Sequence, residues 1–123
     1  MPIKLSIKAL YLFVFSLAVL SVVCSKSPED YVEAGDEFYR EQKYADATLN
    51  YRKAIQQDEQ FSKAYRGLGR VAQAQGDLLE SVAFLRKAAE LQPDDDALKV
   101  ELADRSLELL AGTASRPEAV YQM

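Results

Sequence analysis

A stretch of 34 residues that occurs twice in tandem, at 28–61 and 62–95, constrains this chain more than any other feature. The two copies align without a gap, so that Gly35 matches Gly69. A fixed period of this length is typical of supersecondary units that bury their apolar faces by stacking on one another. We therefore expect an array of stacked units. Other matched pairs are Tyr31 with Tyr65, Tyr44 with Leu78, Ala47 with Ser81, Tyr51 with Leu85 and Ala54 with Ala88.

Each copy contains two runs of apolar residues at helical spacing, separated by a short turn. In the second copy, Gly76-Asp77 is the turn signal and Pro93 stops the second run. Ser27 is placed to cap the first helix of the first copy. The pattern predicts four helices, near 29–42, 45–58, 62–75 and 78–91.

The small residues within these runs require a physical reason. Gly35 and Gly69 lie in the middle of predicted helices, where glycine costs roughly 1 kcal/mol relative to alanine. That cost is tolerable where two helices must approach closely. The same reasoning applies to the small residues at two further equivalent places, Ala47 with Ser81 and Ala54 with Ala88.

This alternation of small and large residues resembles the tetratricopeptide repeat (TPR). The first copy departs from the family pattern at Glu59, where proline is usual, and the second departs at Ala72 and Ser81, where an aromatic residue and alanine are usual. These departures leave the fold intact but loosen the packing prediction locally. The resemblance implies an all-α fold, in which two tandem TPR hairpins and a C-terminal capping helix form a short right-handed solenoid. The matching residues are Tyr31, Ala34, Gly35, Phe38, Ala47, Tyr51 and Ala54 in the first copy, and Tyr65, Leu68, Gly69, Leu85, Ala88 and Pro93 in the second.

A fifth helix is expected at 96–111, with Gly112 as its stop and 112–123 as a flexible tail. Two adjacent apolar stripes run along it. One stripe should close the end of the stack, as terminal helices do in solenoids. The first stripe is the candidate surface for a partner or for self-association; the alternative is that both stripes wrap onto the second repeat. The first stripe is Leu98, Leu102 and Leu109, and the second is Val100, Ala103, Leu107 and Leu110.

Composition excludes several kinds of site. The 123 residues include no histidine, which removes Ser-His-Asp and Cys-His catalysis and histidine zinc sites. The formal net charge of −4 disfavours nucleic acid as a partner. We interpret the acidic run 94–96 as a helix N-terminus rather than a metal site, because calcium loops need glycine and further spaced oxygens. We expect no enzyme activity, no cofactor and no metal.

The first 24 residues have the layout of a secretory signal. Lys4 and Lys8 precede an uncharged run at 9–23, which is shorter than the roughly 20 residues of a transmembrane helix. Cys24 follows the run and resembles the acylated cysteine of a bacterial lipoprotein, although Val23 departs from the small residue usual before it. Acylation of Cys24, plain cleavage and an uncleaved anchor remain open. Residues 25–29 would form a short tether to a TPR domain at 30–111. The repeats are thus expected to be exported and membrane-associated, on the periplasmic side if the source is bacterial.

In the family, the first helix of each repeat lines the concave side of the solenoid. Lys63, Arg66 and Arg70 share one helix face by their spacing, and the resemblance places Tyr39 and Gln73 beside them. Such a face suits a carboxylate-bearing peptide, since arginine offers paired donors. The alternative is an ordinary solvated face that pairs with Asp36 across the groove.

The sequence therefore predicts a non-catalytic protein–protein interaction module. It would present a short TPR groove to a peptide or helix of a cell-envelope partner, with acidic peptides among the expected ligands. The alternative is a structural assembly or docking subunit that acts through the apolar faces of the last helix, with a homodimer as one form. Membrane contact is expected through the N-terminal lipid or anchor.

Overall fold

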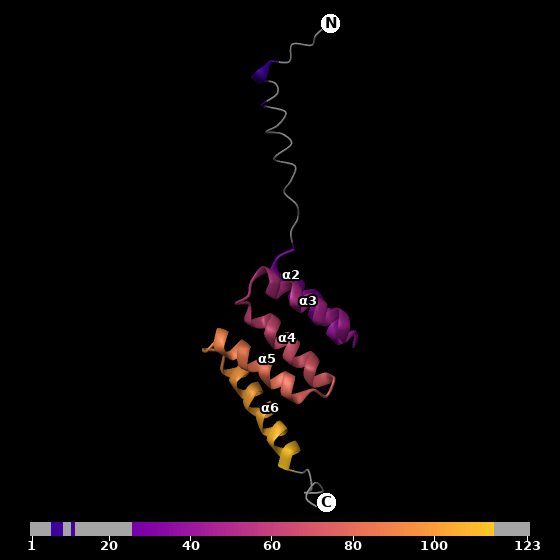
Figure 1. The fold of residues 1–123 in the computed structure, drawn as a ribbon, viewed down its shortest axis with the longest axis vertical. Helices are drawn as coiled ribbons and strands as arrows, with labels where there is room; N and C mark the ends of the chain where they lie inside the picture. The colour runs from indigo at the N-terminus through magenta and orange to yellow at the C-terminus, as the bar shows by residue number, and fades with distance from the viewer. Residues whose placement is uncertain (1–5, 9–10, 12–25, 115–123) are drawn as a thin grey trace, which may run out of the picture.

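The computed structural model describes residues 6–8, 11 and 26–114, and the described part contains helices but no strand. The helices stack in chain order, with α2 and α3 at one end and α6 at the other (Figure 1). The expected all-α solenoid of two hairpins and a further helix is confirmed. The helices are α2 (Pro28–Arg40), α3 (Tyr44–Gln57), α4 (Ser62–Ala74), α5 (Leu78–Leu91) and α6 (Asp96–Ala114).

Two features expected from the sequence lie outside the described residues. They are the lipidation site Cys24 with most of its signal segment, and the tail from residue 115 onward. Within the described ranges, none of the helices combines the length and the apolar character that crossing a membrane requires.

Helix α2 begins with a capping box. The Ser27 hydroxyl accepts a hydrogen bond from the Asp30 backbone N–H at 3.2 Å, and the Asp30 carboxylate accepts one from the Ser27 backbone N–H at 2.7 Å. The hydrogen bonds from Ser27 lower the pKa of Asp30. Two otherwise unsatisfied donors of the first turn are thus paired, which fixes where the helix starts.

The two hairpins turn in the same way. Gln42 and Gly76 occupy equivalent repeat positions, and both adopt left-handed backbone conformations, with φ of 60° and 83°. The next residue in each turn donates its N–H back across the helix end, from Lys43 to Phe38 C=O and from Asp77 to Ala72 C=O, at 2.9 Å in both. This pattern satisfies the last carbonyls of α2 and α4 and sends the chain into the following helix.

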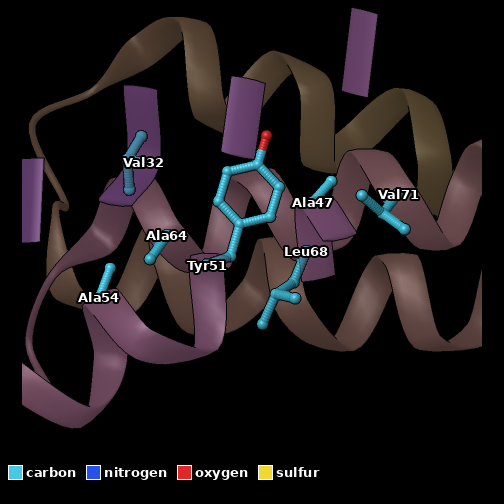
Figure 2. Packing of buried hydrophobic residues seen from close by; sticks show 7 residues of the cluster. All are labelled: Val32, Ala47, Tyr51, Ala54, Ala64, Leu68 and Val71. Atoms are coloured by element: carbon cyan, nitrogen blue, oxygen red, sulfur yellow. The ribbon is translucent and has the colours of Figure 1, made fainter. Parts of the chain in front are cut away.

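Tyr51 of α3 fills the space between the two repeats. Its side chain is fully buried (Figure 2). A Cβ atom built on Gly35 of α2 would lie 2.6 Å from the Tyr51 ring, and one built on Gly67 of α4 would lie 2.4 Å from it. Because real Cβ atoms do not approach so closely, the ring requires glycine on both neighbouring helices. The close approach expected at Gly35 is therefore present, and its partner is an aromatic ring.

The second hairpin packs around Gly69. A Cβ there would lie 2.9 Å from Leu85 Cγ and 3.3 Å from the Ser81 carbonyl oxygen, so α4 and α5 approach closely, as expected. Ser81, which replaces the usual alanine, is fully buried. Its hydroxyl donates a 2.8 Å hydrogen bond to the Gly69 carbonyl. The polar substitution is accommodated because this buried hydroxyl has a partner.

Helix α6 closes the stack, and the partner surface expected on it is wrong for Leu98. Leu98 is only 1% exposed and belongs to a core cluster with Leu85 and Ala88, and Leu102 packs against the same cluster. Because Leu98 is buried against the α5 residues of this cluster, it stabilises the chain's own core and is not accessible to another molecule. Leu102 and Leu109, the other residues of the first stripe, are half-buried. The exposed apolar residues belong to the second stripe: Val100 at 61%, Leu107 at 64% and Leu110 at 63%.

The expected helix stop at Gly112 is also wrong, since α6 continues to Ala114. Among the described glycines, the left-handed conformation that ends many helices occurs at Gly76 and not at Gly112. The Thr113 hydroxyl instead donates to the Leu110 carbonyl at 2.7 Å, within the last turn. Glycine weakens a helix by roughly 1 kcal/mol, which does not by itself end one.

Candidate functional site

A groove of about 350 Å³ lies between α2 and α4, the first helices of the two repeats. Its two walls carry opposite charges. Acidic residues come from α2 and basic residues come from α4, with Val32 and Gly67 between them. The lining consists of Glu29, Val32, Glu33, Asp36, Lys63, Arg66, Gly67 and Arg70.

The repeat explains how the opposite charges meet. Glu29 and Lys63 are 34 residues apart, and so are Asp36 and Arg70, so each pair occupies one repeat position in successive copies. Stacking places equivalent positions side by side. Lys63 Nζ lies 2.7 Å from Glu29 Oε1, and Arg70 Nη1 lies 3.7 Å from Asp36 Oδ1. The pairing with Asp36 that the sequence left open is thus present for Arg70.

Arg66 is held from the other side, by α6. Its Nε donates to Glu101 Oε2 at 2.7 Å, and its Nη1 lies 3.8 Å from Asp95 Oδ2. Asp95 also accepts the Leu98 backbone N–H at 2.9 Å, which makes it the N-terminal cap of α6. The acidic run at 94–96 therefore works as a helix N-terminus. In the described part of the chain, no group of three or more histidine, cysteine, aspartate or glutamate side chains is placed to hold a metal ion.

Asp36 is fixed from inside the protein as well as from across the groove. The Tyr51 hydroxyl donates a 2.7 Å hydrogen bond to Asp36 Oδ1, the oxygen that faces Arg70. Burial raises the pKa of Tyr51, and the hydrogen bond to Asp36 raises that pKa further. The same ring that separates the repeats therefore sets the position of an acidic side chain in the groove.

Two other residues expected at the site differ in their placement. The guanidinium of Arg70 lies 4.6 Å from the centroid of the Tyr39 ring, so these two expected residues are brought together by a cation–π contact. Tyr39 in turn packs against Tyr44 at a ring distance of 5.8 Å. Gln73 lies beyond Arg70 on α4, and neither Tyr39 nor Gln73 is part of the groove lining.

Sequence reasoning missed three features of the groove. Gly67 was missed because its repeat equivalent is Glu33, so the 34-residue alignment gives no glycine pair to notice. Glu33 itself lines the groove and is exposed. The contacts of Arg66 with Glu101 and Asp95 depend on how α6 docks, which periodicity does not fix.

Comparison with known families supports this architecture. Residues 35–76 match a family model described as TPR repeat, and the match spans the second half of α2, all of α3 and α4, and the turn that follows. The match supports the resemblance of these repeats to the TPR family. TPR repeats generally mediate protein–protein interaction and are typically non-catalytic. No curated protein sequence matches the chain significantly.

Proposed function

We propose, from the TPR match and from the groove between α2 and α4, that this chain is a non-catalytic module that binds a peptide or helix of another protein. The observation that carries the proposal is the groove itself. It combines a small, partly apolar floor at Val32 and Gly67 with charged groups on both walls. A few convergent polar groups around an apolar strip are what a surface needs to orient a bound peptide.

Partner capture from detergent-solubilised source membranes tests this function. The groove variant carries Glu33→Arg, at an exposed side chain that lines the groove. The control carries Glu37→Arg, which makes the same charge reversal at an exposed position of the same helix outside it. We expect the groove variant to lose the partner and the control to retain it. Equal capture by both variants would contradict binding through the groove.

A second candidate function, docking through α6, is favoured by one observation. Val100, Leu107 and Leu110 each expose more than 60% of their surface on a single helix. Two repeats are fewer than the three or so that usually make a stable array, so further burial would stabilise this one. Sedimentation equilibrium in density-matched detergent compares Leu107→Glu/Leu110→Glu with the control Leu49→Glu/Leu79→Glu. A loss of association in the α6 variant alone would support docking, and a monomer throughout would count against self-association.

We also propose that the module is exported and held at a membrane, on the periplasmic side if the source is bacterial. This proposal rests on the sequence of residues 1–24 and on Cys24 at the end of the apolar run. A tethered module would keep the groove close to envelope partners. The intact mass of the membrane-extracted protein separates an acylated Cys24, a plainly cleaved chain and an uncleaved one. An unmodified, uncleaved chain recovered in the cytosol would overturn the proposal.

A further inference from the structure

The basic residues of the groove are already engaged by the chain's own carboxylates. Lys63 pairs with Glu29, Arg70 with Asp36, and Arg66 with Glu101 and Asp95. An acidic ligand would have to compete with these carboxylates for each cation. The exchange of one carboxylate for another gains little in free energy, because exposed ion pairs are worth at most about 1 kcal/mol.

Glu33 is in the opposite situation. It lines the groove, its side chain is exposed, and among the described residues no ion pair or hydrogen bond engages its carboxylate. It lies one residue from Val32, whose side chain is at the groove floor and is 6% exposed. A ligand cation can therefore meet a carboxylate here without displacing an existing partner.

The summed charge around the groove is negative, as is the charge of Glu33. The lining contains three carboxylates and three cations, which cancel. Around it, Asp95 at the start of α6 and Glu101 of α6 contact Arg66 and add two negative charges, and Arg40, whose Nε donates to the Asp36 carbonyl, adds one positive charge, so the groove and these contacting side chains carry a net charge of −1. A concave surface with an excess of one sign attracts ligands of the other sign and raises their association rate.

We propose that the groove's ligand is a basic segment of a protein, with a lysine or arginine that pairs with Glu33 beside an apolar residue over Val32. The inference rests on the proposed function, since it names the ligand chemistry of the same groove. The expected charge of the ligand is thus opposite to that of the acidic peptide expected from Lys63, Arg66 and Arg70, because in the folded chain these cations are paired.

A random peptide library displayed on phage tests the charge preference. The library is selected on the full-length chain held in non-ionic detergent, and the selected peptides are then titrated by fluorescence polarisation. We expect lysine and arginine to be enriched among them, and their affinity to fall as salt concentration rises. Glu33→Gln should weaken binding roughly two- to fivefold, as expected for one exposed ion pair. Glu37→Gln, on the same helix but outside the groove lining, should leave affinity unchanged.

Lys63→Gln gives the sharpest result, because the two ligand chemistries predict opposite signs. Removal of this cation frees Glu29, so a basic peptide should bind more tightly, whereas an acidic peptide would bind more weakly. Selection of acidic peptides, or weaker binding by the Lys63 variant, would overturn the basic-ligand inference while the groove remained the binding site. If the affinity of the selected peptides is unchanged by both Glu33→Gln and Lys63→Gln, the proposed function itself is overturned.

Discussion

The Tyr51 hydroxyl donates a 2.7 Å hydrogen bond to Asp36 Oδ1, which joins the core between the repeats to the wall of the groove. The ring is buried between two glycines, while the carboxylate that it holds faces Arg70 in the groove. One side chain therefore both spaces the helices and positions a charged group. Loss of the whole Tyr51 side chain should affect both stability and the groove. A substitution that keeps the ring should separate the effect of the hydrogen bond from that of the packing.

Tyr51→Phe removes the hydrogen bond and keeps the ring. We expect the free energy of unfolding to fall by about 1 to 2 kcal/mol, since a hydrogen bond to a carboxylate is lost while packing is conserved. Urea unfolding followed by circular dichroism measures the change. Tyr44→Phe is the matched control, because no hydrogen bond engages the Tyr44 hydroxyl in the described part of the chain. An equal effect of both substitutions would contradict the role of the Tyr51–Asp36 bond.

The raised pKa of Tyr51 predicts how stability depends on pH. Because the folded state holds this hydroxyl protonated beyond the usual tyrosine value of about 10, its contribution is complete below that pH and is lost as the pH rises through the higher folded pKa. The stability difference between the natural chain and Tyr51→Phe should therefore shrink above about pH 10. Urea unfolding of both proteins across this range measures the difference. A gap that stays constant or widens would contradict the assigned direction.

Gly67→Ala should destabilise the chain by about 1–3 kcal/mol, because the added methyl group overlaps the Tyr51 ring. Gly112→Ala is the control, since nothing lies within 4 Å of a Cβ at that helical position. A double-mutant cycle with Tyr51→Leu identifies the cause: the penalty of Gly67→Ala should largely disappear when the ring is absent. Strictly additive effects would show that the glycine is required for some other reason.

Gln42→Gly should stabilise the first hairpin by about 0.5–1 kcal/mol. Gln42 holds the left-handed conformation that Gly76 adopts at the equivalent turn, and this conformation is costly for a residue with a Cβ. Thermal unfolding should show a melting temperature higher by about 3–6 °C. The reciprocal change Gly76→Gln should lower it. A lower melting temperature for Gln42→Gly would mean that the Gln42 side chain makes a stabilising contact that outweighs the strain.

The repeat made much of the fold predictable. Period and turn signals located the helices of both hairpins within a few residues, and the costly mid-helix glycines Gly35 and Gly69 correctly indicated close approach. The face of α6 that packs on α5 was not predictable, because Leu98 and Val100 belong to two stripes that both place apolar residues at helical spacing. In the structure Leu98 of the first stripe packs on α5, and the neighbouring contacts, the cap at Asp95 and the Arg66–Glu101 pair, are ones that periodicity does not report.

For the groove, the shared face of Lys63, Arg66 and Arg70 was predictable from spacing, but their charge partners were not. Helical spacing reports the residues of one helix, whereas the ion pairs join residues of different helices. The 34-residue register pairs Glu29 with Lys63 and Asp36 with Arg70, so two of the pairs were implicit in the repeat. The pairs of Arg66 with Glu101 and Asp95 could be recognised only from the three-dimensional arrangement.

Photo-crosslinking in the source cells tests most directly whether the groove is the binding surface. A photoreactive amino acid replaces Glu33 in the groove or, as a control, Arg86, which is exposed on α5 and does not line it. The proposed function predicts a discrete protein adduct on irradiation of the position-33 chain and none from the position-86 chain. An adduct at position 86 with none at position 33 would contradict it.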